Sequence, residues 1–319
     1  MEKTRNNRAK INENYNKKIS FGLSLNIEIE DYYKIISKYS KYLSSVYFSL
    51  PFGEEFHTRN KVKEEYSQDN AKEKLLNILN LFKDNGIKLE AVINQYHIDI
   101  NKLKKSLFDL DRFVNVDSIC CLDEYVDVIN KHYDGKMYLI SSFNNGSFKK
   151  INDDTYEKYN MIVLGKEYMR EPEKIKKIQN KGLEIKLLVN NGCAFNCKSC
   201  REGYRECVRT FEKNLKNFTP EELYAIQSFF PWELEELFHE LKDSNIVKEV
   251  KLSSRPSTYE YIDNCLESYI YNVNPREYID ENINNYHLWG RQANLIQFFQ
   301  YFDLKRIEKM KRNLWERRK

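Results

Sequence analysis

The chain has 319 residues, of which 52 are basic, 48 are acidic and 41% are hydrophobic. This length fits one large α/β domain or two smaller ones, and the apolar fraction is high enough for a sizeable core, which excludes a disordered chain as the default. The near balance of charge lacks the basic excess of a general nucleic-acid binder. Basic residues gather at both termini, where a solvated end is the simpler interpretation and contact with RNA the alternative.

Short apolar strands alternate with amphipathic helices along most of the chain. Helical spacing of apolar residues predicts helices at 31–43, 71–83, 100–110, 123–132, 155–159, 172–182, 218–227, 232–241 and 259–271. Strands are predicted at 21–27, 46–50, 87–93, 114–120, 136–143, 161–164, 183–189 and 247–253. This alternation predicts a (β/α)8 TIM-like barrel, with an open doubly wound sheet as the alternative.

The sequence predicts three regions. Residues 1–18 form a basic flexible N-terminus, residues 19–275 form the barrel, and residues 276–319 form a helical C-terminal tail. Within the barrel, residues 190–246 form a long insertion after the seventh strand. Insertions at the C-terminal ends of barrel strands are where this fold builds active sites. The apolar residues of the tail need a surface, which either the barrel or a partner protein could supply.

The N-terminal segment and the overall hydropathy predict a cytoplasmic protein without membrane contact. The opening run MEKTRNNRAKINENYNKK has no apolar region of the kind that a secretory signal contains. No apolar run reaches the length of about 18 residues that a membrane span requires. Thiols in the cytosol stay reduced, so clustered cysteines there are ligands or catalysts more often than disulfide partners.

Four of the seven cysteines lie close together just after the seventh predicted strand: Cys193, Cys197, Cys200 and Cys207. The first three have CxxxCxxC spacing, which lets three thiolates of one loop bind one cubane and leaves the fourth iron to another ligand. The residues between them are mostly polar, which argues against free cysteines that pack in the core as small hydrophobic residues. We therefore predict a [4Fe–4S] cluster at these cysteines, with the ligand role of Cys207 open. Zinc is the alternative, since four thiolates suit its tetrahedral coordination.

Polar residues follow several predicted strands and are candidates for catalysis. Glu167, Asn190 and Arg255 each lie at or just past a strand end, a location that predicts function in a barrel. A salt bridge between loops is the alternative for Glu167 and Arg255, and helix capping is the alternative for Asn190. His57 and His97 also follow strands, but a lone histidine is more often structural.

Several short motifs occur in a fixed order over roughly residues 20–272. They are Val46-Tyr47-Phe48 with Arg59, Val92-Ile93-Asn94, Ile162-Val163-Leu164-Gly165-Lys166-Glu167, Leu183-Glu184-Ile185 with Cys193, and Val250-Lys251-Leu252-Ser253-Ser254-Arg255. Their order resembles the collagenase-like peptidase family U-thirty-two, which includes anaerobic ubiquinone- and RNA-hydroxylation members. The resemblance implies a barrel that carries a [4Fe–4S] cluster in place of a conventional protease site. Two features depart from the family pattern: the cysteines are compressed, and Ser254 replaces a glycine.

The cysteines, the polar strand ends and the resemblance together predict an iron–sulfur enzyme that works anaerobically. It would hydroxylate, or transfer sulfur to, an RNA base, a peptide or a small molecule. One alternative is a peptidase-like or peptide-modifying protein, as the family name implies. A second is a radical S-adenosylmethionine enzyme, although that superfamily carries CxxxCxxC after its first strand. A third is a structural zinc or electron-transfer protein that docks on a partner through the C-terminal tail. GxSxG and HExxH motifs are absent, which disfavours serine and zinc hydrolases.

Overall fold

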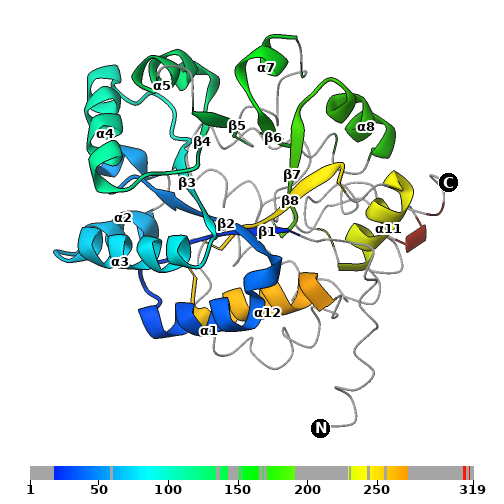
Figure 1. Ribbon diagram of the computed structural model, residues 1–319, viewed down its shortest axis with the longest axis horizontal. Helices are drawn as coiled ribbons and strands as arrows, with labels where there is room; N and C mark the ends of the chain where they lie inside the picture. Colours follow the sequence, from blue (N-terminus) through cyan, green and yellow to red (C-terminus); the bar gives the residue numbers. More distant parts are fainter. Residues whose placement is uncertain are drawn as a thin grey trace, which may run out of the picture.

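The protein is a closed barrel of eight parallel strands that follow one another in chain order (Figure 1). The computed structural model describes residues 18–57, 60–133, 137–142, 151, 153–164, 168, 171–190, 229, 231–242, 245–254, 257–271, 312, 313 and 316. The predicted (β/α)8 barrel is confirmed, and the open doubly wound sheet is excluded because β8 pairs with β1.

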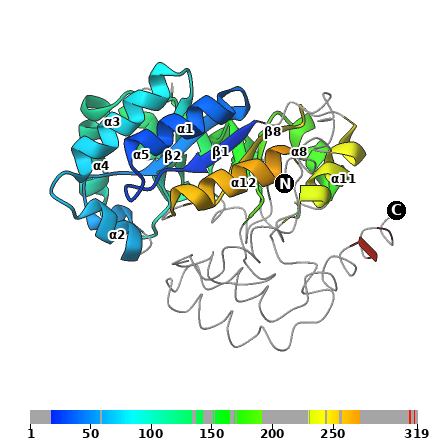
Figure 2. The ribbon, with the colours of Figure 1, turned by 90° about the horizontal axis from the view of Figure 1, so that it is seen from below.

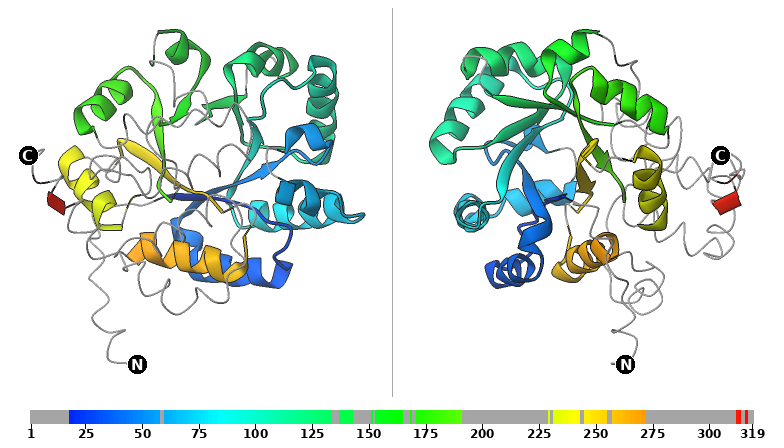
Figure 3. Two further views of the ribbon diagram at one scale, coloured as in Figure 1. Left: turned by 180° about the vertical axis from the view of Figure 1, so that it is seen from behind. Right: turned by 45° about the vertical axis from the view of Figure 1, so that its right-hand side comes forward.

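Each strand pairs with the next one along the chain, and β1 closes the ring with β8. Figure 3 shows this ring from two further sides, with the helices outside it. The strands are β1 (Ile19–Gly22), β2 (Leu43–Ser49), β3 (Lys88–Ile93), β4 (Ser118–Cys121), β5 (Tyr138–Ser141), β6 (Met161–Val163), β7 (Glu184–Leu188) and β8 (Val247–Leu252).

Helices lie outside the ring, and in the side view α1 and α12 lie next to each other along β1 and β8 (Figure 2). The helices are α1 (Ile29–Tyr39), α2 (Asn60–Tyr66), α3 (Ala71–Asp84), α4 (Ile100–Phe113), α5 (Val126–His132), α7 (Asp153–Lys158), α8 (Pro172–Asn180), α11 (Pro231–Leu241) and α12 (Tyr259–Tyr271). None of the helices in the described part of the chain combines the length and the apolar character of a membrane span.

Local sequence accounts for the ends of several helices. The side chain of Asp99 caps α4 by accepting hydrogen bonds from the N–H groups of Asn101 and Lys102, each at 3.0 Å. Pro172 opens α8, where its missing N–H leaves no helical bond unmade. Gly86, with φ of 71°, follows α3 in the left-handed conformation that lets a helix end without strain.

The main core lies between the outer face of the barrel and the helices. Side chains alternate along each strand, so Phe21 and Phe48 point outward and are fully buried against helices. The α3 side chain Phe82 packs edge-on against both Phe21 and Tyr32, with ring centroids 5.7 and 5.4 Å apart. Burial of such aromatic rings is the main favourable contribution to this packing.

The first strand differs from its predicted position. The prediction covered residues 21–27, whereas β1 ends at Gly22. After it, the N–H of Ser24 donates to the hydroxyl of Tyr32 at 2.9 Å, and the N–H of Leu25 donates to Glu65 Oε2 at 3.3 Å. Side chains therefore satisfy these backbone groups in place of a neighbouring strand. Leu25 remains buried, which explains why the apolar pattern extends beyond the strand.

One helix of the long connection after the seventh strand is confirmed. The helix predicted at 232–241 is α11, which packs beside α8 as the regular barrel helix between β7 and β8 (Figure 1). Residues 191–228, between Asn190 and Phe229, are called the excursion below. They lie outside the described residues, as do residues 1–17 and 272–311. The predicted N-terminal and C-terminal regions remain predictions.

Candidate functional site

The candidate site is the C-terminal face of the barrel at the adjacent strands β6, β7 and β8. Leu164, Asn190 and Ser254 follow these three strands, directly before chain that lies outside the described residues. Parallel neighbours end on one face, so all three chain ends lie on the same side of the barrel. The remaining predicted site residues lie outside the described residues: Glu167, Cys193, Cys197, Cys200, Cys207 and Arg255.

Asn190 is described, and its amide joins the ends of β7 and β8. The N–H of Ser253 donates to Asn190 Oδ1 at 2.5 Å, and Asn190 Nδ2 donates to the carbonyl oxygen of Ser253 at 3.2 Å. Nδ2 also lies 3.1 Å from the hydroxyl of Tyr261 and 3.8 Å from Sγ of Cys265, both on α12. Asn190 thus acts as a clamp between two strand ends and a helix, and its predicted catalytic role remains a prediction.

The groups around this clamp are uncharged. Burial raises the pKa of the Tyr261 hydroxyl well above its usual value. Burial also raises the pKa of the Cys265 thiol to about 11, because a thiolate would lose its hydration there. Near neutral pH the clamp therefore consists of neutral hydrogen bonds, and Cys265 remains a thiol.

The excursion 191–228 begins and ends at one point of the barrel. The N–H of Phe229 donates to the carbonyl oxygen of Val189 at 2.7 Å, which ties the returning chain to the end of β7. The hydroxyl of Tyr269, on α12, donates to the carbonyl oxygen of Phe229 at 2.7 Å. Residues 189, 190 and 229, together with their bonds to β8 and α12, are called the neck below. All four clustered cysteines lie between the two sides of this neck in the sequence.

The end of β8 is fastened to β1 as well. Ser254 donates from its hydroxyl to the carbonyl oxygen of Gly22 at 2.8 Å and accepts from the N–H of Gly22 at 2.7 Å. Ser254 is fully buried, so these bonds are shielded from water. They fix the backbone immediately before Arg255.

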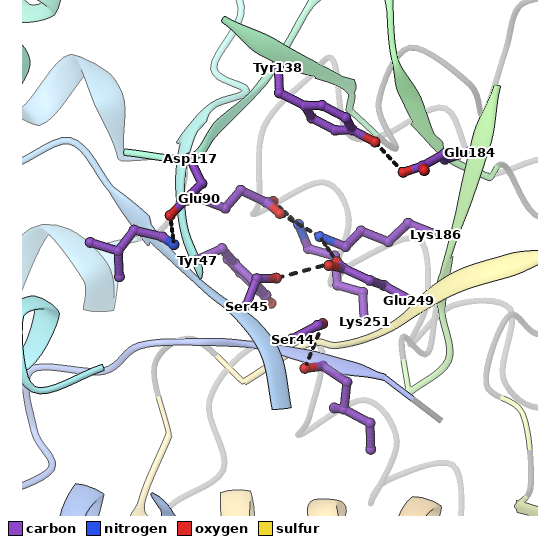
Figure 4. Close-up of polar contacts among 12 residues, drawn as sticks. Ser44, Ser45, Tyr47, Glu90, Asp117, Tyr138, Glu184, Lys186, Glu249 and Lys251 are labelled. Atoms are coloured by element: carbon purple, nitrogen blue, oxygen red, sulfur yellow. Dashed lines mark hydrogen bonds and ion pairs between the residues drawn. The ribbon is translucent and has the colours of Figure 1, made fainter. Parts of the chain in front are cut away.

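A second group of polar residues lies inside the barrel, between facing strands (Figure 4). Lys186 contacts Glu90 and lies 2.6 Å from Glu249. Lys251 lies 2.8 Å from Glu90, and its ammonium lies 3.9 Å from the centre of the Tyr47 ring. Glu90, Lys186, Glu249 and Lys251 are called the interior charge network below.

Pairing keeps this network charged despite its burial. Burial by itself would raise the pKa of Glu90, but the cations of Lys186 and Lys251 outweigh it and hold that pKa at about 2. Burial would likewise lower the pKa of Lys186, and the carboxylates of Glu249 and Glu90 outweigh it and raise that pKa above its usual value. Two ammonium groups face two carboxylates, so the network is neutral overall.

The interior charge network belongs to the scaffold. Glu90 and Lys186 are fully buried, and the apolar side chains of Val92 and Leu188 follow them toward the C-terminal end of the same strands. These two residues belong to an inner apolar cluster that also includes Tyr47 and Met161. Paired charges of this kind join strands on different sides of the barrel, and we assign the network a structural role.

Sequence reasoning missed this network, although a signal for it was present. Glu90, Lys186, Glu249 and Lys251 are charged residues within strands whose neighbouring positions are largely apolar, at positions that face inward. A charge at an inward position needs a partner of opposite sign, so two lysines and two glutamates on facing strands could have been paired in advance.

A further buried carboxylate shapes the first βα loop. Glu65, on α2, accepts hydrogen bonds at Oε1 from the hydroxyl of Ser24 at 2.8 Å and from Asn26 Nδ2 at 2.6 Å. Helix α2 was not predicted, because its short run of polar residues shows no clear apolar face. Arg59, which the family resemblance singled out, lies outside the described residues.

Comparison with known proteins gives a remote structural likeness. No protein-family model matches the chain, and no curated protein sequence matches it. Among solved structures, the chain is similar to that described as the U32 peptidase Mk0906, with a TM-score of 0.47 and 11% sequence identity over 76% of this chain and 94% of that one. The description of that structure names the family that the order of the motifs resembles.

Proposed function

We propose that the chain is an iron–sulfur barrel enzyme that modifies its substrate at the C-terminal face beside β6, β7 and β8. The observation that carries this proposal is the neck. Phe229 returns to Val189 by a 2.7 Å hydrogen bond, so the segment with all four clustered cysteines is one closed excursion from a single strand end. A barrel builds its active site from such loops on this face.

The donor set suits a [4Fe–4S] cluster. Cys193, Cys197, Cys200 and Cys207 supply four soft thiolate donors within one short stretch of chain. In the described part of the chain, no group of three or more histidine, cysteine or acidic side chains could hold a metal ion. A cluster would therefore depend on the cysteine excursion. When bound, it would supply an iron site or an electron for chemistry on the substrate.

Two further residues of the chain would act on the substrate. Glu167 follows Leu164 by three residues, and Arg255 directly follows Ser254. Three residues of chain span at most about 11 Å, and adjacent strands lie about 4.8 Å apart, so Glu167 and Arg255 start within reach of the neck. In this proposal Arg255 orients an anionic or carbonyl oxygen of the substrate, and Glu167 holds or accepts a proton.

The cluster proposal is tested by metal analysis of protein purified without oxygen. We expect iron and acid-labile sulfide in the wild type, and loss of both in Cys193→Ser, Cys197→Ser and Cys200→Ser. Cys121→Ala is the matched control, because Cys121 is buried in β4, and β5 and β6 separate β4 from β7. This variant should leave the iron content unchanged. If the analysis finds one zinc per chain and no sulfide, the cluster proposal is wrong and the cysteines form a structural zinc site.

Cys207 decides whether an iron is open to substrate. If Cys207→Ser retains full iron content while the other three serine variants lose it, the fourth iron has no fixed thiolate and can bind a substrate atom. Equal loss in all four variants would indicate a closed cluster, which favours electron transfer and the docking role.

The reaction itself is tested by profiling modified nucleosides, modified peptides and metabolites in a deletion strain. We expect a product to be missing, to return with the wild-type gene, and to stay missing with Glu167→Gln or Arg255→Ala. Full restoration by both variants would remove the two catalytic roles, and full restoration by the cysteine variants would remove the cluster from the function.

A further inference from the structure

His97 has a strained backbone that no helix end explains. It lies between β3 and α4 with φ of 62°, in the left-handed region that costs a residue with a side chain. Among the described non-glycine residues, Lys242 is the other one with positive φ, also 62°. Lys242 directly follows α11, where a left-handed residue commonly ends a helix. His97 ends no helix, since α4 begins at Ile100.

The neighbouring loop holds His97 in this conformation. The N–H of His97 donates to Glu124 Oε1 at 3.1 Å. The hydroxyl of Tyr125 donates to the carbonyl oxygen of Gln95 at 2.8 Å and accepts from the N–H of Ile98 at 2.9 Å. Glu124 and Tyr125 belong to the short 3-10 helix Asp123–Tyr125 after β4. Three hydrogen bonds from the next βα loop therefore impose the backbone of this one.

The imposed conformation leaves the imidazole on the surface of the C-terminal face. Ile98 is buried, whereas His97 is exposed. The half-buried Tyr96 lies beside it, with the two ring centres 6.2 Å apart and the planes tilted by 44°. His57, which follows β2, is buried in contrast. The strained loop thus presents an imidazole on the face where barrel enzymes bind substrate.

We propose that His97 is a substrate-contacting residue of this face, held ready by the strained β3–α4 loop. The proposal rests on the proposed function and adds to it the group that forms a hydrogen bond to the substrate and exchanges a proton with it. Imidazole is the side chain that exchanges a proton near neutral pH. Backbone strain that opposes stability persists where function requires the conformation.

Two glycine variants with the same starting φ test the proposal. His97→Gly and Lys242→Gly should each raise the midpoint of thermal unfolding by about 2 °C, because glycine adopts positive φ without strain. In the deletion strain, Lys242→Gly should restore the missing product fully. His97→Gly should leave the amount of product at least about tenfold lower, since the imidazole is gone. A gain in stability together with a loss of product cannot come from a merely structural histidine.

His97→Asn provides a second variant that does not depend on the stability gain. Asparagine tolerates positive φ and keeps hydrogen-bonding groups but cannot act as an acid or base, so the unfolding midpoint should stay near that of the wild type while product falls by at least about tenfold.

The outcomes separate this inference from the proposed function. Full restoration of product by His97→Gly and His97→Asn, while the cysteine variants fail, would overturn the role of His97 alone. An unchanged or lower unfolding midpoint in His97→Gly would also overturn it, because the strain would then be absent. A deletion strain with an unaltered product profile would remove the proposed function and the role of His97 with it.

Discussion

The barrel holds its strands together in two different ways at two levels. In its interior, Lys186 and Glu90 are full charges, and each is satisfied by a partner of opposite sign. At the C-terminal end, Asn190 joins β7 to β8 through a neutral amide, with neutral groups of α12 around it. Charges are tolerated where every partner lies on a rigid strand. At the neck, by contrast, the hydrogen bonds of Asn190 join neutral groups.

The largest effect should come from breaking the interior charge network. Lys186→Met removes the cation between two buried carboxylates and should lower the free energy of unfolding by about 3–5 kcal/mol, because the remaining charges stay buried without compensation. Urea unfolding measures the change. Lys248→Met is the matched control, since Lys248 is more than half exposed and lies 3.4 Å from Glu184, and it should cost less than about 1 kcal/mol. Equal losses in both variants would contradict the structural role of the network.

Acid should weaken the interior charge network before it affects the neutral neck. The pKa of Glu90 is about 2 in the folded chain, against an ordinary value of 4.5. Because folding lowers this pKa, the stabilisation is complete above about pH 4.5 and is lost as pH falls toward 2, by an amount on the order of 3 kcal/mol. Urea unfolding between pH 2 and 6 should show this slope in the wild type and a smaller slope in Glu90→Gln. The control Glu173→Gln should keep most of the wild-type slope, because Lys176 lowers the pKa of this carboxylate only at an exposed site of α8 where water screens the ion pair.

A smaller loss should follow from opening the clamp at the neck. Asn190→Ala leaves the buried N–H and carbonyl of Ser253 without these partners and should lower the free energy of unfolding by about 2 kcal/mol. Hydrogen exchange at the amide of Ser253 should quicken in this variant. Asn85→Ala is the control, since Asn85 makes a local bond of 2.8 Å to the carbonyl oxygen of Leu81, and it should cost about 1 kcal/mol or less. An unchanged exchange rate at Ser253 would show that the clamp does not hold the strand ends.

The smallest effect concerns Tyr47, which contacts Lys251 of the network and the backbone of the next residue, Leu252. Its ring lies against Lys251, and its hydroxyl donates to the carbonyl oxygen of Leu252 at 2.6 Å. Tyr47→Phe removes the hydroxyl that makes this hydrogen bond and keeps the ring, and it should cost about 1 kcal/mol in urea unfolding. Tyr33→Phe is the control at a side chain of which 54% is exposed, and it should leave stability within about 0.5 kcal/mol. If Tyr47→Phe loses no more stability than the control, the hydrogen bond of the Tyr47 hydroxyl does not stabilise the barrel.

Prediction from sequence succeeded where the signal is periodic and local. The helix at Tyr259–Tyr271 was predicted at its observed bounds, and all eight strands were found. The first strand was extended too far because Leu25 and Ile27 stay buried after β1 has ended. An alternating apolar pattern reports burial, and burial continues in a loop whose backbone bonds to side chains such as Glu65.

The site was harder to predict because its contacts join distant parts of the chain. Asn190 was chosen for its place after a strand, but its partner Ser253 lies 63 residues away. Nothing in the local pattern distinguishes an amide that contacts substrate from one that clamps a neighbouring strand. The strain at His97 was equally hidden, since Glu124, 27 residues further on, is needed to impose it.

The sequence by itself determined the barrel, because side-chain alternation and helical spacing are properties of short segments and eight repeats of strand and helix leave few folds open. It also located the cysteines after the seventh strand. Only the tertiary structure decided that Lys186 meets Glu90, 96 residues away, since an inward position gains a partner only when the sheet closes. It likewise decided that the chain around the cysteines leaves and returns at one point, because a hydrogen bond between Val189 and Phe229 depends on the whole path between them.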